Sequence, residues 1–334
     1  MDAMGGDHAP QATVAGALLA AAELDPAHSI TLVGRQAVVE QTLDALLSGE
    51  YAALAPHRGR LHIVDAPDVI EMAEKPSAAI RGKPNSSMMV GLRMHAEGAC
   101  DAFVSAGNTG AQMAASMVLL RLHDGIKRPA IVTVFPTARR PIVVLDSGAN
   151  VDCSATELVH FARLGAVYAQ DMLGRENPAV GLLSIGEEPE KGNAVTKEAH
   201  AMLQASGLNF VGNVEGRDLP AGRSHAGDLD VVVCDGFVGN VVLKFYEAVA
   251  PLMVGLLVKA GMEQGKIMAA LKQLDYSEHG GAPLLGVKGV SIICHGRSSP
   301  RALKNAIQVA VKAVETRLDE QISRRLDGAD GAAA

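Results

Sequence analysis

The residues best suited to chemistry in this chain are amides, cations and one histidine in short glycine-rich turns. They are Asn108, Lys191, Asn193, Asn240, Lys244, His295 and Arg297. Side-chain amides and backbone N–H groups stabilise a developing oxyanion, and Lys and Arg side chains bind phosphate. This set of residues indicates transfer of an acyl group without a covalent enzyme intermediate.

Each of these residues also has a simpler structural interpretation. An asparagine behind a strand commonly forms a turn or caps a helix. Lys191 could be a solvated surface residue, and His295 could be a satisfied histidine at the edge of the core. Asp2 and Asp7 could ligate a metal, or they could only shape a turn. The sequence leaves these alternatives open.

The candidate residues share a position behind apolar runs. Six turns have this pattern: Asp2–Asp7, Ser105–Gly110, Asp146–Asn150, Ile185–Asn193, Asp235–Asn240 and His295–Pro300. If the preceding strands are parallel, the turns converge on one edge of a sheet. We therefore expect a single crevice suited to an anion, built from backbone N–H groups and helix N-termini.

Apolar, β-branched runs alternate with helical patterns along the chain. The predicted strands are Ile30–Val33, Leu61–Asp65, Ala102–Ser105, Ala130–Phe135, Ile142–Asp146, Val180–Ile185, Asn209–Gly212, Val231–Cys234 and Val290–Cys294. Their near-continuous apolarity predicts strands covered on both faces, hence a mainly parallel sheet. The segment between Phe135 and Ile142 is too short for a crossover, so those two runs should form an antiparallel hairpin.

Helix starts are marked by capping residues. Ser154-Ala-Thr-Glu157 is a capping box that predicts a helix to about Met172. Ser299-Pro300 predicts a long helix to about Arg325. Helices should also open behind Thr109-Gly110 and Asn193.

One stretch interrupts the alternation of strands and helices. From about 241 to 281 two helical patterns follow each other without a strand between them. We expect a single α/β domain over residues 1–334, with this stretch projecting as a helical arm. The longest apolar run in the arm is Ala248–Val258. This run is shorter than the roughly 18 residues that are needed to span a bilayer.

The composition excludes several classes of protein. The chain has 334 residues, of which 48% are hydrophobic and 20% are charged, as is typical of a globular protein. A net charge of −7, no Trp and 3% aromatics disfavour nucleic-acid binding. Four widely spaced cysteines (Cys100, Cys153, Cys234 and Cys294) predict a reduced, cytoplasmic location, with neither disulfides nor a zinc site. The dinucleotide G-x-G-x-x-G, P-loop and G-x-S-x-G motifs are absent from the six turns.

Ordered motifs along the whole chain resemble one family, the acyl-(acyl carrier protein):phosphate acyltransferases of bacterial phospholipid synthesis. The resemblance rests on blocks at 2–7, 83–88, 105–111, 185–193, 209–216, 230–240, 280–286 and 295–299. They read DAMGGD, KPNSSM, SAGNTGA, IGEEPEKGN, NFVGNVEG, DVVVCDGFVGN, GGAPLLG and HGRSS.

The resemblance implies a fold and an activity. The fold would be a three-layer αβα arrangement around a mainly parallel mixed sheet, similar to isocitrate/isopropylmalate dehydrogenases and phosphate acetyltransferase. The reaction would convert acyl-(acyl carrier protein) and inorganic phosphate into acyl phosphate for phosphatidic acid synthesis, by direct attack of phosphate on the thioester. It implies a homodimer without cofactor or metal, functionally linked to a membrane glycerol-3-phosphate acyltransferase.

The resemblance also assigns roles to residues. Lys191 and Arg297, with the helix start at Ser298–Ser299, are assigned to phosphate; Asn240 and Asn108 would orient the substrate or the oxyanion; and His295 would shuttle a proton. The other residues expected to bind substrate are Asp2, Gly5, Gly6, Asp7, Lys83, Ser86, Ser87, Gly107, Thr109 and Asn193. Family members usually carry a short apolar strand where Met1 stands. We therefore expect either a true start upstream of Met1 or a lost first strand, which would weaken the sheet beside the site.

Other functions compete with this one. An enzyme of the same fold could use coenzyme A thioesters, or could be a metal- and NAD-dependent dehydrogenase. A non-catalytic acyl-binding scaffold at the membrane would make the arm its main functional element. The apolar arm should be covered in a C2 dimer. Its tip around Leu252, Met253, Leu256 and Leu257 could also contact the inner membrane face weakly and reversibly.

Overall fold

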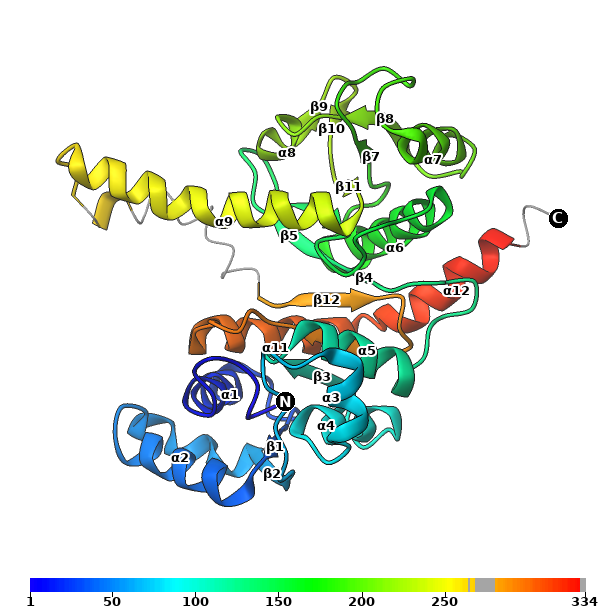
Figure 1. The fold of residues 1–334 in the computed structure, drawn as a ribbon. Coiled ribbons are helices and arrows are strands. Elements are labelled where there is room, and N and C mark those ends of the chain that lie inside the picture. Colours follow the sequence, from blue (N-terminus) through cyan, green and yellow to red (C-terminus); the bar gives the residue numbers. More distant parts are fainter. Residues whose placement is uncertain (264, 268–279, 331–334) are drawn as a thin grey trace. The chain divides into compact units, whose positions relative to one another are not determined.

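A computed structural model of the chain describes residues 1–263, 265–267 and 280–330 (Figure 1). The tertiary contacts divide the chain into two compact units, where a single domain was expected. Unit 1 comprises residues 1–123 and 277–319, and unit 2 comprises residues 124–276 and 320–334. Each unit has an α/β architecture with its own sheet, so the predicted fold class is confirmed within both units.

Unit 1 contains two groups of strands. Strands β1 (Ile30–Gly34) and β2 (Leu61–Asp65) are parallel. Strand β13 (Val290–Ile293) pairs in parallel with β3 (Ala102–Ser105) and antiparallel with β12 (Ala282–Leu285). The short β12 was not predicted, because its sequence contains Pro283 between glycine-rich flanks.

The first residues of the chain join these two groups of strands. The Asp2 N–H donates to the Val104 carbonyl of β3 (2.9 Å), and the Ala3 N–H donates to the Val33 carbonyl of β1 (2.9 Å). Asp2 and Val33 form a parallel bridge. Residues 1–3 therefore occupy the strand position between β1 and β3, and the sheet is continuous beside the turns that follow.

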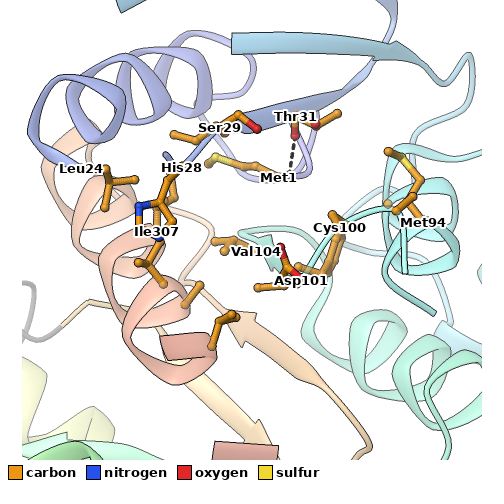
Figure 2. A pocket seen from close by; sticks show the side chains of 18 of the residues that line it. Met1, Leu24, His28, Ser29, Thr31, Met94, Cys100, Asp101, Val104 and Ile307 are labelled. Carbon is orange, nitrogen blue, oxygen red and sulfur yellow. Dashed lines mark hydrogen bonds between the residues drawn. The ribbon is translucent and has the colours of Figure 1, made fainter. Parts of the chain in front are cut away.

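A cavity of about 250 Å³ lies beside Met1 (Figure 2). The Met1 ammonium donates to the Thr31 carbonyl (2.6 Å), and burial lowers the pKa of the ammonium. The cavity is lined mainly by apolar groups of β1, β3 and the helix that starts at Pro300.

Seven helical segments cover the sheet of unit 1. They are α1 (Gln11–Glu23), α2 (Gln36–Ser48), the 3-10 helix η1 (Ala52–Arg60), α3 (Pro76–Gly82), α4 (Ser87–Ala96), α5 (Thr109–Leu119) and α11 (Pro300–Glu315). Helix α1 packs against α11, and α4 packs against α5. Helix α11 begins at the predicted proline but ends well before the predicted end at Arg325. Arg317 adopts a left-handed conformation (φ 52°), which ends α11 before α12 (Leu318–Asp330) begins.

Unit 2 is built on a five-stranded sheet with the order β5-β6-β11-β7-β8. Strand β5 (Thr133–Phe135) pairs antiparallel with β6 (Ile142–Leu145), so the predicted hairpin is confirmed. Strands β6, β11 (Val231–Val233), β7 (Val180–Leu183) and β8 (Phe210–Val214) are parallel. The valines of β11 are fully buried, as expected for a central strand covered on both faces.

The remaining elements of unit 2 include a helix that starts as predicted. Helix α6 (Ala155–Leu173) begins with the predicted capping box at Ser154 and packs against β6 and β11. The other elements are α7 (Ala194–Gln204), α8 (Asp218–Ala221) and the short strands β4 (Ala130–Ile131), β9 (Arg223–Ser224) and β10 (Gly227–Asp228).

Helix α9 (Gly236–Lys259) forms the described part of the predicted arm (Figure 1). Its first half packs Val242, Leu243 and Tyr246 on the core of unit 2, and the Tyr246 ring meets Phe135 edge-on at 5.2 Å. The second helical pattern of the arm lies largely outside the described residues. Among the residues that are described, α9 is the one helix long and apolar enough to cross a membrane by length and composition. From the sequence we noted only the shorter run Ala248–Val258 in this region. The helix is longer than that run because it already starts at Gly236.

Much of α9 is apolar and exposed. Phe245 is 72% exposed and Leu252 60%, and Leu256 and Val258 are also exposed. Lys244 and Glu247 form an ion pair with each other at 2.8 Å, so they neutralise one another on the helix surface. The described residues do not cover these apolar side chains, and the expectation that another surface covers them stays a prediction.

Candidate active site

The six turns named from the sequence fall into two groups. Unit 1 holds Asp2–Asp7, Ser105–Gly110 and His295–Pro300, and unit 2 holds the other three. In each unit the turns follow the carboxyl ends of neighbouring parallel strands. The prediction that strand ends converge is therefore correct within each unit, but the single sheet edge expected for all six turns is wrong.

Glycines allow the turns of unit 1 to approach each other closely. A Cβ on Gly5 would lie 2.8 Å from the Gly107 backbone nitrogen. Gly6 has φ +112°, and a Cβ there would lie 3.1 Å from the Gly296 carbonyl oxygen. The Asp7 N–H donates to that same carbonyl at 2.7 Å. Gly5 and Gly6 thus let three backbone turns approach each other, because a Cβ at either one would meet the backbone of a neighbouring turn.

Asp2 is a positioning residue of unit 1, whereas it was expected to bind substrate. Its carboxylate is 1% exposed. It accepts the Ser105 hydroxyl at 2.7 Å and the Met4 N–H at 3.0 Å. The Ser105 hydroxyl oxygen in turn accepts the Gly107 N–H at 3.0 Å. This chain of bonds fixes the first two turns and leaves the carboxylate occupied within the protein.

Asn108 is also engaged within the protein. Its Oδ1 caps α5 by accepting the Ala111 N–H (3.0 Å). Its Nδ2 donates to the carbonyls of Met72 (3.0 Å) and Glu74 (2.9 Å). Because both ends of the amide are used, Asn108 anchors the 71–74 loop and caps a helix, instead of serving as the predicted oxyanion donor. Thr109, the first residue of α5, is exposed and lies where the helix leaves N–H groups unpaired.

The Lys83–Ser87 segment has structural partners in place of the expected substrate. The Lys83 ammonium forms an ion pair with Glu74 and donates to the Val69 carbonyl (2.7 Å). Ser86 caps α4, and both Ser86 and Ser87 are buried. Lys83, Ser86 and Ser87 thus hold α4 and the 69–74 loop in place, and their contact with substrate stays a prediction.

His295 and Arg297 are the exposed polar side chains of the third turn in unit 1. The Arg297 N–H donates to His295 Nδ1 at 3.2 Å. Nδ1 therefore carries a lone pair, and Nε2 carries the proton of the neutral ring. Arg297 is 81% exposed and lies 3.8 Å from the Asp7 carboxylate. An exposed pair of this kind contributes at most ~1 kcal/mol, so a bound dianion can redirect the guanidinium.

The two serines that follow complete this turn. Ser298 donates its N–H to the His295 carbonyl, and Ser299 caps α11 by accepting the Ala302 N–H. The predicted helix start behind Arg297 is therefore confirmed, and it lies next to the exposed guanidinium in the chain.

Lys191 is the exposed cation of the loop after β7 in unit 2. Its N–H donates to the Glu188 carbonyl (3.0 Å), which closes a tight turn. A Cβ on Gly186 would lie 2.9 Å from Lys191 Cγ, so the lysine stem rests on Gly186. Among the described residues, no carboxylate forms an ion pair with the Lys191 ammonium. Glu187, in contrast, pairs with Arg217 at 3.3 Å. Lys191 is therefore free to bind an anion.

Asn193 fulfils the simpler of its two interpretations. Its Oδ1 accepts the Thr196 N–H (2.8 Å) and the Thr196 hydroxyl (3.0 Å), so it caps α7. It was expected to bind substrate, but the structure shows it positioning the helix that follows Lys191.

Asp146 and the start of α9 form the other polar feature of unit 2. The Asp146 carboxylate accepts N–H groups from Ile131 (3.0 Å) and Asn150 (2.7 Å), and it also accepts the Asn150 side-chain amide (2.9 Å). Burial raises the pKa of Asp146, and these hydrogen bonds oppose the rise. A Cβ on Gly239 would lie only 1.8 Å from the Asp146 carbonyl oxygen. Gly239 therefore lets the first turn of α9 rest directly on the Asp146–Asn150 turn.

Asn240 stands at the edge of this contact. Its side chain lies beside Gly148, where a Cβ would be 3.5 Å from Asn240 Oδ1. The residue is exposed, and its amide makes no hydrogen bond with any described residue. Asp235 caps α9 by accepting the Val238 N–H (2.8 Å). Asn240 is thus an exposed amide donor beside a helix N-terminus, and its role toward the oxyanion stays a prediction.

The cysteines are protonated at neutral pH. Burial raises the pKa of Cys294 and of Cys153 to about 12, and it raises the pKa of Cys234 well above its usual value. Burial also raises the pKa of Cys100. A thiol with such a pKa is a poor nucleophile. Among the residues that the structure describes, no group of three or more His, Cys, Asp or Glu side chains could hold a metal ion.

Sequence analysis missed the roles of Asp146, Gly236 and Gly239. The signal was present in the spacing of the two glycines, which places them on one face of a helix. A Cβ on Gly236 would lie 2.7 Å from both the Asn150 carbonyl oxygen and Asp146 Oδ2. The two glycines form the flat face by which α9 rests on the neighbouring turn.

Solved structures with a similar fold are phosphotransacylases. A phosphotransacetylase from Streptococcus pyogenes has a TM-score of 0.60 at 16% identity, covering 90% of this chain and 91% of the other. A branched-chain phosphotransacylase from Enterococcus faecalis has a TM-score of 0.53 at 14% identity, covering 86% and 99%. The fold is therefore that of the phosphotransacylase class.

The sequence comparisons identify the family. The profile of the family described as "Fatty acid synthesis protein" matches residues 1–321, and the chain belongs to this family. A phosphate acyltransferase from Desulforamulus reducens is 47% identical over 341 residues, covering 99% of this chain and 98% of the relative. A phosphate acyltransferase from Heliobacterium modesticaldum is 47% identical over 339 residues, covering 98% and 97%. The family resemblance noted in the sequence is confirmed.

Proposed function

We propose that this protein transfers a fatty acyl group from acyl-(acyl carrier protein) to inorganic phosphate and releases acyl phosphate. Its family and relatives make it an acyltransferase enzyme, and their names support phosphate as the acceptor. The observation that carries the proposal is Lys191, an exposed lysine without an ion-pair partner among the described residues, in a tightly turned loop at the carboxyl end of β7.

Phosphate is held as a dianion by fixed positive charge. In unit 2 the exposed Lys191 ammonium supplies this charge as a compact point charge. Positioning the dianion against the thioester carbonyl makes the attack effectively unimolecular, which supplies much of the rate enhancement.

The attack itself needs charge stabilisation more than proton transfer. One phosphate oxygen forms a bond to the thioester carbon, the carbonyl oxygen becomes an oxyanion, and the C–S bond then breaks to release the carrier thiolate. Asn240 donates to the oxyanion, because its amide is free beside the N-terminus of α9. The thiolate is a good leaving group, so it departs without a strong general acid and takes its proton from solvent.

No cysteine takes the acyl group in this scheme. Cys294, Cys153 and Cys234 lie beside the turns; burial raises the pKa of Cys294 and of Cys153 to about 12 and that of Cys234 well above its usual value. The phosphate oxygen is the nucleophile, so the acyl group passes directly from the carrier to phosphate.

The donor, the assembly and the location are parts of the same proposal. A fatty acyl product is supported by the family description, and acyl phosphate would feed phosphatidic acid synthesis through a membrane glycerol-3-phosphate acyltransferase. The exposed apolar side chains of α9 support a homodimer interface. They also support weak contact of the protein with the inner membrane face, from a cytoplasmic location.

A comparison of donors tests the proposal against its nearest alternatives. The wild-type protein is incubated with phosphate and either palmitoyl-(acyl carrier protein) or palmitoyl coenzyme A, and acyl phosphate is trapped with hydroxylamine. We expect hydroxamate from the carrier-protein thioester at a much higher kcat/KM than from the coenzyme A thioester. A preference for coenzyme A would identify a coenzyme A-linked transacylase, and binding of the thioester without turnover would identify an acyl-binding scaffold.

A further inference from the structure

A buried asparagine on the strand next to β7 is bonded to the loop that carries Lys191. Asn213, in β8, has a side chain that is 0% exposed. Its Nδ2 donates to the Glu188 carbonyl oxygen at 2.8 Å. Its Oδ1 lies 3.0 Å from Nδ1 of His200 in α7. One amide thus joins the Lys191 loop, the strand beside it and the helix that follows.

The directions of these two hydrogen bonds are fixed by the acceptor in the loop. A carbonyl oxygen can only accept, so the Asn213 group facing Glu188 is the NH₂ end of the amide. The oxygen end then faces His200, whose Nδ1 carries a proton and donates to it. The His200 ring also packs edge-on against Phe210 of β8 at 5.1 Å between centroids, so its orientation is held by packing as well.

The bond from Asn213 reaches the backbone atom that places Lys191. The Glu188 carbonyl oxygen accepts both the Asn213 amide and the Lys191 N–H (3.0 Å). If the Asn213 donor is lost, this carbonyl is free to rotate away, and the turn that ends at Lys191 loses its fixed acceptor. Gly186 completes the arrangement, because its missing side chain leaves room for the lysine stem.

We infer that Asn213, itself oriented by His200, is a positioning residue that holds the Glu188–Lys191 turn so that the Lys191 ammonium is presented to phosphate. This inference rests on the proposed function, in which Lys191 binds the acceptor. Asn213 does not touch substrate, because its side chain is fully buried and both ends of its amide are used. Its contribution therefore passes entirely through Lys191.

The test is a double-mutant cycle between Asn213→Ala and Lys191→Ala in the full-length protein. The phosphate KM and kcat are measured at saturating acyl-(acyl carrier protein). We expect Asn213→Ala to raise the phosphate KM ~10-fold, which corresponds to the loss of one buried hydrogen bond. The double variant should differ from Lys191→Ala by no more than about 2-fold, because residues that act through one group are not additive.

A control variant and a replacement variant separate an effect on phosphate binding from an effect on folding. Asn209→Ala removes a similar bond, from Asn209 Nδ2 to the Asn177 carbonyl (3.1 Å), next to the other end of β8. It should leave the phosphate KM within about 2-fold of the wild type, as a surface change does. If Asn213→Ala does not fold, His200→Ala replaces it in the cycle, since it removes the donor that orients the Asn213 amide.

The outcomes separate the inference from the proposed function. If Lys191→Ala alone leaves phosphate kinetics unchanged, the role of Lys191 in the proposed function fails, and this inference fails with it. Lys191→Ala could impair phosphate kinetics while Asn213→Ala raises the phosphate KM by the same factor with and without Lys191. In that case only the inference is overturned. A wild-type phosphate KM in a folded Asn213→Ala variant would overturn the inference as well.

Discussion

The variant Gly239→Ala tests the close contact between the start of α9 and the Asp146–Asn150 turn. The added Cβ would lie 1.8 Å from the Asp146 carbonyl oxygen, 2.9 Å from its carbonyl carbon and 3.1 Å from the Cys234 sulfur. Real Cβ contacts are essentially never shorter than 3.0 Å. Two of the three obstacles are backbone atoms, which cannot turn aside as a side chain can. Either the helix or the Asp146–Asn150 turn must therefore move.

The size of the effect follows from what that movement breaks. Overpacking of this kind costs about 1–3 kcal/mol. Separating the two elements also breaks the bond from the Gly236 N–H to the Asn150 carbonyl (2.7 Å). With about 1 kcal/mol for that bond, the free energy of unfolding should fall by about 2–4 kcal/mol. In a chain of this size the melting temperature should fall by roughly 3–6 °C. Turnover should also fall at least ~10-fold, because Asn240 is the next residue.

Gly255→Ala in the same helix is the matched control. No atom lies within 4 Å of the Cβ that it would add. Alanine is favoured over glycine in a helix by about 1 kcal/mol, so this variant should be as stable as the wild type or slightly more stable. Thermal unfolding followed by circular dichroism, with activity measured on the same samples, compares the two variants. Equal melting temperatures and equal activity would refute the close contact between α9 and the Asp146–Asn150 turn.

Three further predictions follow from the site and the arm. Lys191→Ala should lower kcat/KM for phosphate by ~10²-fold, because a charge that anchors the dianion is lost. Lys197→Ala removes an exposed charge from the next helix and should leave kcat/KM for phosphate unchanged. Equal losses of kcat/KM in the two variants would mean that only the net charge of the protein matters. Cys294→Ala should keep most activity, and alkylation in mildly alkaline buffer should be slow, because the pKa of about 12 keeps the thiol protonated; an acyl-enzyme found by mass spectrometry would contradict this. The double variant Leu256→Glu/Leu257→Glu, if still dimeric, should sediment less with liposomes than the wild type; equal sedimentation would leave α9 as a dimer element only.

Local sequence signals predicted most of the elements. Most predicted strands are present close to their expected ends, because buried parallel strands leave an uninterrupted β-branched pattern; the run Ala130–Phe135 is instead divided into β4 and β5. The capping box at Ser154 marks the start of α6. The break at Arg317 was not foreseeable, since no glycine or proline marks the left-handed residue. The division into two units depends on contacts between distant segments, on which local periodicity carries no information.

The candidate site was predictable by region, but the side-chain roles were not. Asn108 and Asn240 follow similar glycine-containing turns, yet one amide is fully bonded and the other makes no hydrogen bond with the described residues. The difference arises from the 71–74 loop, whose carbonyls are far from Asn108 in sequence. Asp2 is likewise occupied by Ser105, which is distant in sequence. Residue type and spacing locate such turns, and only tertiary contacts decide which side chains remain available.

Direct transfer of the acyl group to phosphate is tested by following both products in one reaction. The wild-type protein is mixed with a comparable concentration of acyl-(acyl carrier protein), in the presence and in the absence of inorganic phosphate. Free carrier thiol and hydroxylamine-reactive acyl phosphate are followed in the same reaction. We predict that both products appear in equal amounts and only when phosphate is present. Release of one carrier thiol per enzyme without phosphate, or thiol release with phosphate but no acyl phosphate, would contradict direct transfer.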